Sequence, residues 1–250
     1  GQRGQDEARL ILEEMATLKF SVENAVFEKL PDYVVGVVVA RGIDAQRHTH
    51  LPQDVLRSGE SVFRDRHCQC DYKEHPDLTP YREAFETVGI NPNRFPSSIE
   101  AMGKRVLGGA ALPFIHPVID LVNGISLNFA VPMGAHDLDQ LGGDFEVRFS
   151  REGETFTALG SDQEETLSAG ELIYGDANRV RTRRWIWRQS EWGKVIPQSK
   201  NVLFPVDGFR GRNLAQVLEA RDQLAAALAG EFGALVSVHL IDKDHPFIQV

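Results

Sequence analysis

The chain has 250 residues, of which 42% are hydrophobic, so it is long enough to bury a substantial core in one large domain or two small ones. No apolar run approaches the ~20 residues needed to span a bilayer, and the N-terminus shows no signal-peptide pattern, so we expect a cytoplasmic protein with no membrane partner. The formal net charge of −9 argues against a protein that coats nucleic acid non-specifically, and DNA is not an expected partner.

The first third of the chain is predicted to contain one helix and two strands. Residues 6–18 place apolar side chains at helical spacing and predict an amphipathic helix. Strands are predicted over Phe20–Phe27 and Tyr33–Arg41, and the continuous β-branched run in the second is typical of a strand buried on both faces. Residues 43–78 show no clear period, and we assign no element there.

Three helices are predicted in the middle of the chain. They run from about Thr79 to Gly89, from Ser97 to Leu107, and over Phe114–Leu127. The second is predicted to begin with a capping box, in which Ser97 accepts a hydrogen bond from a first-turn amide and Glu100 reaches back.

The remainder of the chain is predicted to be rich in strands and to end in a helix and a strand. Short strands are predicted between Asn128 and Phe204, including Glu146–Phe149, Glu154–Ala158 and Glu171–Tyr174. The last two elements are a helix over Asn213–Ala229 and a strand over Ala234–Ile241. Because no repeat, low-complexity tract or long linker is present, residues 1–250 are predicted to form a single α+β domain.

Polar residues are concentrated in the otherwise apolar segment Leu112–Leu141. Within it, the elements Ile119–Asn123 (IDLVN) and Val131–Asp139 (VPMGAHDLD) resemble the "VDVTN"-like and "QPMHAFDLD" elements of the B3/4 editing domain of the bacterial phenylalanyl-tRNA synthetase beta subunit. The chain resembles a free-standing version of that domain most closely. Further matches to the family pattern are Val147-Arg148, Gly153-Glu154, Gly170-Glu171, Asp176 and Asn201-Val202-Leu203. The resemblance covers about residues 82–204.

The resemblance implies a layered β-sandwich with flanking helices. It also implies a pocket that hydrolyses the ester bond of a wrongly charged tRNA, and no cofactor is expected. Two positions depart from the family pattern. Gly134 stands where the family has its pocket histidine, and Val122 stands where the family has a threonine. The acidic pocket residue of the family falls near Gln189–Glu191.

The segment also contains side chains suited to ester hydrolysis. His136 is the predicted general base because imidazole titrates near neutrality, and Asp137 or Asp139 can orient its ring. Asn123 is predicted to bind the carbonyl or amino group of the substrate, and the backbone amide near Gly134 to stabilise the oxyanion. The substrate-binding candidates are Ser126, Gly134, Trp185, Trp187, Gln189 and Glu191. Two structural alternatives stay open: His136 in a salt-bridged turn, and Asn123 as a buried amide that ties a helix end to a loop.

An arginine-rich strip extends from Arg179 to Arg188. Residues 179–194 carry a local charge of +5 in a chain whose net charge is −9. Arginine beside tryptophan suits phosphate contact and stacking on an unpaired base, as a tRNA acceptor end provides. The tRNA-binding candidates are Arg181, Arg183, Arg184 and Arg188. In a single strand, one face would hold Arg181, Arg183, Trp185 and Trp187. The alternative is that the arginines pair with carboxylates while the tryptophans pack in the core.

Histidine and cysteine side chains gather in the region that shows no clear period. The side chains that could bind zinc there are His48, His50, His67, Cys68, Cys70 and His75. The CxC spacing differs from the CxxC of zinc knuckles, and two cysteines one residue apart make a poor disulfide. We therefore predict no metal site and a reducing compartment.

Three functions are compatible with these patterns. The first is a trans-acting deacylase whose partner is the acceptor end of a mischarged tRNA. The second is a non-catalytic tRNA- or RNA-binding or regulatory module, since a similar domain serves as a binding module in a tRNA-lysidine synthetase. The third is a small-molecule hydrolase or binder that has kept the pocket.

Overall fold

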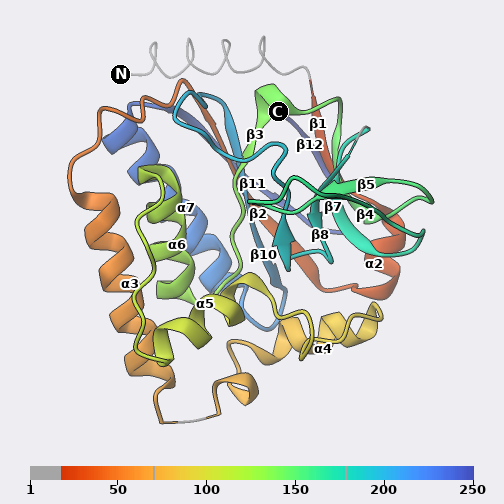
Figure 1. The fold of residues 1–250 in the computed structure, drawn as a ribbon, viewed down its shortest axis with the longest axis horizontal. Helices are drawn as coiled ribbons and strands as arrows, with labels where there is room; N and C mark the ends of the chain where they lie inside the picture. Colours follow the sequence, from red (N-terminus) through yellow and green to blue (C-terminus); the bar gives the residue numbers. More distant parts are fainter. Residues whose placement is uncertain (1–17, 70, 178) are drawn as a thin grey trace.

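The computed structural model describes residues 18–69, 71–177 and 179–250, so the predicted helix over 6–18 lies almost wholly outside the described residues. Two sheets form the centre of the molecule (Figure 1). The larger contains, in spatial order, β12 (Phe247–Gln249), β1 (Lys19–Val22), β4 (Phe145–Phe149), β7 (Leu172–Gly175), β8 (Val180–Arg183) and β9 (Arg188–Gln189). The smaller contains β11 (Leu235–Ile241), β2 (Tyr33–Arg41), β10 (Val202–Phe209) and β3 (His136–Asp137).

Most strand pairs in these sheets are antiparallel. β1 and β4 form a parallel pair in the six-stranded sheet, whereas the four-stranded sheet is antiparallel throughout. A separate two-stranded ribbon consists of β5 (Thr155–Thr157) and β6 (Glu164–Thr166).

Six α-helices surround the sheets within the described residues. They are α2 (Asn24–Lys29), α3 (Leu51–His67), α4 (Thr79–Thr87), α5 (Ser98–Leu107), α6 (Pro117–Phe129) and α7 (Leu214–Phe232). Two 3₁₀ turns, η1 (Tyr72–Glu74) and η2 (Leu138–Gln140), connect them to their neighbours. No helix in residues 18–250, apart from the two undescribed positions, is long and apolar enough to cross a membrane.

The elements are arranged in layers. One face of the four-stranded sheet packs on the six-stranded sheet, and the opposite face packs on α6 and α7, with α3 outside α6 (Figure 1). In β2, Tyr33 and Val35 point into the core between the sheets, whereas Val38 and Ala40 point toward the helices. This two-sided burial was predicted from the β-branched run. The predicted α+β class with a layered sandwich and flanking helices is confirmed.

Glycines allow α7 and α6 to approach their neighbours closely. A Cβ at Gly208 would lie 2.3 Å from a methyl carbon of Val217 in α7. A Cβ at Gly59 of α3 would lie 2.2 Å from the carbonyl oxygen of Gly124 in α6. Side chains at these positions would force the layers apart, so the glycines are required by packing.

Two predicted elements need correction. The strand predicted over Phe20–Phe27 ends at Val22, and α2 follows it; a helix lets the consecutive Val26 and Phe27 both reach the core, which a strand would not. The region 43–78, to which we assigned no element, contains the 17-residue helix α3. Its period is obscured because a glycine and a glutamate are buried on the same face as its apolar side chains.

The start of α5 matches its prediction in part. The Ser97 side chain accepts a hydrogen bond from the Glu100 amide, at 3.4 Å, as expected of an N-cap. The Glu100 carboxylate instead accepts a 2.7 Å hydrogen bond from Arg82. The reciprocal half of the predicted capping box is therefore replaced by an ion pair.

Candidate functional site

A cavity of about 70 Å³ lies where the loop 132–136, β10 and the hairpin of β8 and β9 meet. The predicted site residues that line it are Gly134, His136, Trp185, Trp187, Arg188 and Gln189. Met133, Tyr174 and Asp207 also line it. Since one water needs about 10–15 Å³ by this measure, the cavity accommodates roughly five water-sized groups.

Asp207 is a cavity residue that sequence analysis missed. It lies near the end of β10 and is 2% exposed. Its Oδ1 accepts hydrogen bonds from Tyr33 Oη at 2.5 Å, Tyr174 Oη at 2.6 Å and Trp185 Nε1 at 3.2 Å. Oδ2 has no hydrogen-bond partner within the described residues. A lone carboxylate in the apolar run VLFPVDGF was the signal that could have identified it.

The surroundings of Asp207 raise its pKa toward neutral pH. Burial raises the pKa of Asp207 to about 6, against the opposing effect of the hydrogen bonds from Tyr174, Tyr33 and Trp185. Burial also raises the pKa of Tyr174 well above its ordinary value, so that its hydroxyl remains a donor to the carboxylate. The result is a carboxylate that gains and loses its proton close to physiological pH.

His136 lines the same cavity from β3. Its ring stacks on Tyr174 with centroids 5.7 Å apart, and contacts Phe145 at 4.7 Å. Its Nδ1 is buried without a hydrogen-bond partner in the described part of the chain. Burial, with a smaller contribution from Arg181, lowers the pKa of His136 to about 3, so the ring is neutral at physiological pH. The structure does not place it in the salt-bridged turn that was the alternative.

Gly134 leaves room in front of the histidine ring. A Cβ at this position would lie 3.2 Å from His136 Nε2 and 3.2 Å from Pro205 Cγ. The Gly134 backbone N–H donates to the Pro205 carbonyl at 3.0 Å. The N–H of Gly134 itself is therefore already used by the β10 backbone, and the predicted oxyanion donor would have to be another amide of this loop.

The arginine-rich strip is a hairpin and not a single strand. Arg184 and Trp185 take left-handed backbone conformations, with φ of 47° and 58°, and turn the chain between β8 and β9. Trp185 is consequently buried in the core, edge-on to Tyr33 at 5.3 Å. Trp187 stays near the surface and contacts Phe95. The expectation that both tryptophans share one strand face is wrong.

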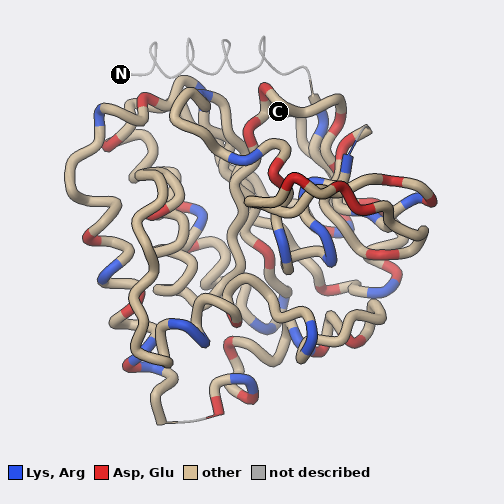
Figure 2. The backbone as a smooth tube through the Cα atoms, in the orientation of Figure 1, with Lys and Arg blue, Asp and Glu red and all other residues tan. Residues whose placement is uncertain are grey.

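Three of the predicted tRNA-binding arginines pair with carboxylates of the chain, and Arg184 does so at 3.9 Å from Glu171. Arg181 is 4% exposed and pairs with the buried Asp176 at 2.5 Å. Arg183 pairs with Glu165 and with Glu171, the latter at 3.0 Å. Figure 2 shows basic residues of β8 close to acidic residues of neighbouring segments.

Arg184 and Arg188 lie beside partly buried aromatic rings near the cavity mouth. The Arg184 guanidinium lies 3.7 Å from the Phe95 ring centroid and 4.8 Å from that of Trp187. Arg188 is exposed and contacts the Trp187 ring. We refer to Arg94, Phe95, Arg184, Trp187 and Arg188 as the arginine–aromatic rim. An open groove of about 530 Å³, lined by Arg94, Phe95 and Arg184 among others, adjoins the rim.

Two predicted pocket residues lie outside the cavity because their helix packs on the other face of the four-stranded sheet. Asn123 and Ser126 belong to α6, which packs on α3 through Gly124. The Ser126 hydroxyl donates to the Val131 carbonyl at 2.5 Å and closes the end of the helix. The cavity lining includes neither residue.

Asp137 and Glu191 are likewise held elsewhere. Asp137 is 3% exposed, caps η2 through the Asp139 amide, and accepts a 2.5 Å hydrogen bond from Ser199. Glu191 accepts a hydrogen bond from the Gly160 amide and pairs with Lys194. Neither residue lines the cavity, and within the described residues His136 Nδ1 has no hydrogen bond from Asp137.

Comparison with known families tests the resemblance directly. The family model described as "B3/4 domain" matches residues 80–226, which is more than half of the chain. The chain belongs to the B3/4 domain family. The family match includes the loop of Gly134 and His136, the hairpin of the rim, and Asp207. The matched segment begins close to residue 82, where the resemblance was predicted to begin. It extends past the predicted end at residue 204 into α7.

Several relatives of this B3/4 chain are beta subunits of phenylalanine–tRNA ligase. The chain is 29% identical over 240 residues to that of Geobacter sulfurreducens, covering 84% of the chain and 28% of the relative. It is 37% identical over 89 residues to that of Pectobacterium atrosepticum, covering 36% of the chain and 11% of the relative. The chain thus spans less than a third of these relatives' length. The predicted resemblance to the synthetase beta subunit is confirmed.

A search of solved structures finds the N-terminal fragment of the phenylalanyl-tRNA synthetase beta subunit from Pyrococcus horikoshii. The match has a TM-score of 0.48 and 14% sequence identity. It covers 88% of the chain described here and 50% of the Pyrococcus horikoshii fragment.

Proposed function

We propose that this protein hydrolyses the ester bond of mischarged tRNA in trans. The observation that carries the proposal is that Asp207 and His136 line one cavity, next to a rim of arginines and aromatic rings. Ester hydrolysis requires a positioned water, a base and a donor to the developing oxyanion. The cavity offers a group for each requirement.

Asp207 is the proposed base. Its Oδ1 is held by three donors, which leaves Oδ2 to accept a proton from an attacking water. A pKa of about 6 places this carboxylate near the value that suits a base at neutral pH. His136 suits this role less well than the sequence predicted, because a ring with a pKa of about 3 is a weak proton acceptor.

His136 is proposed to act as a neutral hydrogen-bonding group. Its Nε2 faces the space above Gly134, where a side chain is absent. A neutral imidazole can donate one N–H to the oxygen on which negative charge develops. The Gln189 side chain donates to the Ala135 carbonyl at 2.7 Å and thereby fixes the loop that carries the ring.

The rim is proposed to bind the tRNA acceptor end. Arg184 and Arg188 can contact phosphates, while Trp187 and Phe95 offer flat surfaces for unpaired bases. The adjoining groove is large enough for nucleotides, whereas the cavity, at about 70 Å³, suits only a small aminoacyl group. We therefore expect a small side chain, such as that of alanine or serine, on the mischarged tRNA.

A panel of tRNAs carrying different mismatched amino acids tests the proposal. Purified protein should release small amino acids faster than buffer alone, and aromatic ones slowly or not at all. If no ester is hydrolysed above the buffer rate, the enzymatic proposal is wrong.

The second candidate function is a tRNA-binding module without turnover. It is favoured by Gly134, which stands where the family pattern has its pocket histidine. This alternative predicts salt-dependent tRNA binding through the rim without release of any amino acid.

A further inference from the structure

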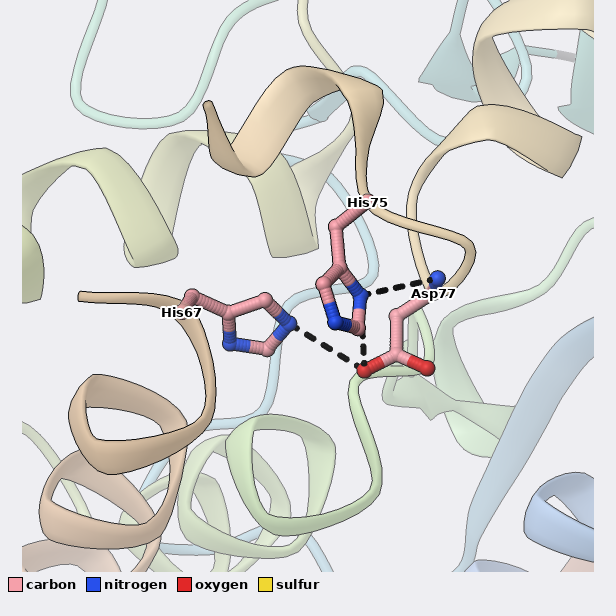
Figure 3. A group of neighbouring side chains, drawn as sticks. All are labelled: His67, His75 and Asp77. Atoms are coloured by element: carbon pink, nitrogen blue, oxygen red, sulfur yellow. Dashed lines mark hydrogen bonds and ion pairs between the residues drawn. The ribbon is translucent and has the colours of Figure 1, made fainter. Parts of the chain in front are cut away.

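Three side chains converge between the end of α3 and the start of α4 (Figure 3). His67 Nε2 lies 3.1 Å from Asp77 Oδ2, and His75 Nδ1 lies 3.4 Å from the same oxygen. One potential ligand atom from each residue lies within 4.8 Å of the other two. The His67 side chain is fully buried, and the other two are largely buried. The three therefore face one small, sheltered space.

The hydrogen bonds of His67 define which ring nitrogen faces that space as an acceptor. Its Nδ1 lies 2.7 Å from the Phe63 carbonyl oxygen, which can only accept, so Nδ1 carries the hydrogen. In the neutral ring, Nε2 is then an unprotonated nitrogen pointing at a carboxylate oxygen 3.1 Å away. Two acceptors at this distance repel unless a proton or a cation lies between them.

The same hydrogen bond is typical of histidines that bind metals. A metal-binding histidine generally donates its other ring N–H to a carbonyl or carboxylate, which fixes its tautomer and orientation. Zinc–ligand bonds of about 2.0–2.2 Å in tetrahedral geometry separate ligand atoms by roughly 3.3–3.5 Å. The distances of 3.1 and 3.4 Å to Asp77 Oδ2 are close to that separation. His75 Nδ1 also accepts a 3.2 Å hydrogen bond from the Asp77 backbone amide, which a metal bound at this nitrogen would replace.

We infer that His67, His75 and Asp77 form a binding site for Zn²⁺ or a similar divalent transition metal. Two imidazoles and one carboxylate supply three ligands, and a fourth position remains for water. The site uses two histidines of the His/Cys group that sequence analysis considered, together with Asp77, which it did not. This inference departs from the sequence prediction that the chain holds no metal.

Neighbouring groups influence this site in different ways. Arg66 Nη1 lies 3.3 Å from Asp77 Oδ2 and competes with a cation for it, but its side chain is 37% exposed and can turn to solvent. Cys68 is exposed, with its Sγ 3.8 Å from the Asp65 carbonyl, and is not part of the group. Cys70 lies outside the described residues.

Metal binding would join α3 to the turn that precedes α4. Asp77 lies two residues before α4, which carries Tyr81. The Tyr81 hydroxyl donates to the Asp207 backbone carbonyl at 2.8 Å, beneath the cavity. The metal would thus stabilise a structural link to β10, independently of whether the cavity hydrolyses any substrate.

Calorimetric titration of the chelator-treated full chain with zinc chloride tests the inference. We expect about one equivalent to bind and the thermal unfolding temperature to rise with zinc, since the metal binds the folded site. His75→Ala and Asp77→Asn should each weaken zinc affinity by about 100-fold or more, because losing even an outer-shell partner costs 10–100-fold. His50→Gln, which changes an exposed histidine outside the group, should leave affinity unchanged.

Cobalt substitution supplies a second readout that does not depend on stability. Co²⁺ bound to the wild-type chain should give the visible absorption of a four-coordinate site, and Asp77→Asn should lose it. Absence of saturable zinc binding by the wild-type chain would overturn the inference. Wild-type affinity in both His75→Ala and Asp77→Asn would also overturn it, since the metal would then bind elsewhere.

Discussion

The hydroxyl of Tyr174 lies 2.6 Å from Asp207 Oδ1, and this hydrogen bond joins the two sheets of the molecule at the cavity. Tyr174 belongs to β7 of the six-stranded sheet and Asp207 to β10 of the four-stranded sheet. The bond is buried, so it both stabilises the sandwich and fixes the carboxylate. Packing and chemistry therefore depend on the same pair of residues.

Replacement of the carboxylate tests the proposed base. Asp207→Asn should reduce hydrolysis of mischarged tRNA by about 10²–10⁴-fold, because general-base catalysis typically contributes that factor. The amide side chain can still accept hydrogen bonds from the tyrosines, and circular dichroism checks that the fold is kept. Unchanged hydrolysis by a folded Asp207→Asn protein would eliminate Asp207 as the base.

The rate of hydrolysis should depend on the ionisation of Asp207. Only the deprotonated carboxylate accepts a proton, so the wild-type rate should be level above pH 7 and fall below about pH 6. Measurement of initial rates between pH 5 and 8 checks this. A profile that stays flat down to pH 5 would contradict the assignment.

Folding stability should respond to pH through His136. Its pKa is about 3 in the folded protein and near 6.5 ordinarily, so the unfolded chain binds a proton more readily. The contribution of the neutral His136 ring to the free energy of unfolding is fully present above about pH 6.5. It is lost as pH falls toward 3. His136→Gln should therefore show a shallower loss of stability between pH 6.5 and 4, measured by urea unfolding.

An exposed histidine provides the control for this measurement. His50→Gln changes an exposed side chain outside the core, and it should keep the wild-type pH dependence. Asp207 acts in the opposite direction, since its raised pKa adds stability as pH falls below about 6. That contribution is common to all three proteins and cancels in the comparison. Equal slopes for His136→Gln and wild type would refute the burial argument.

A side chain at Gly134 should impair hydrolysis without affecting tRNA binding. In Gly134→Ala, the new methyl group would lie 3.2 Å from His136 Nε2 and displace it. We expect hydrolysis to fall by up to about 10-fold, because the ring must shift by a few tenths of an ångström and a ~1 Å misplacement can cost 10²-fold. Gly230→Ala, which meets nothing within 4 Å, is the matched control. Equal rates for the two variants would show that the ring does not act at this position.

The sequence allowed prediction of the elements whose local pattern is strong. β2 and the start of α5 follow from a β-branched run and a capping serine, both of which act through neighbouring residues. α3 was missed because its buried face includes Gly59 and Glu60, whose burial depends on contacts with α6 and Leu112. Such contacts between distant segments have no local signature.

The site was predictable only in part for the same reason. His136, Trp187 and Gln189 line the cavity as expected, whereas Asn123 belongs to a helix that packs through its neighbouring glycine. Asp207 became visible only when the fold brought Tyr33 and Tyr174 to it from other strands. Family motifs locate a segment, but the direction of each side chain depends on the tertiary structure.

The rim arginines should determine the salt dependence of tRNA binding. Arg184→Gln and Arg188→Gln should each weaken binding and reduce the slope of log affinity against log salt concentration by about one if they contact one phosphate. Fluorescence anisotropy with labelled tRNA measures both quantities. Arg212→Gln, which pairs with Glu83 away from the cavity, is the control. An unaltered slope in both rim variants would remove the rim as the tRNA contact.

The central claim is that Asp207 in this cavity drives hydrolysis of a small aminoacyl ester on tRNA. The most direct measurement is the release of labelled alanine or serine from a mischarged tRNA by wild type and by Asp207→Asn, side by side. Wild type should release the amino acid rapidly, and the variant should release it near the buffer rate. Equal release by the two folded proteins, or none by the wild type, would contradict it.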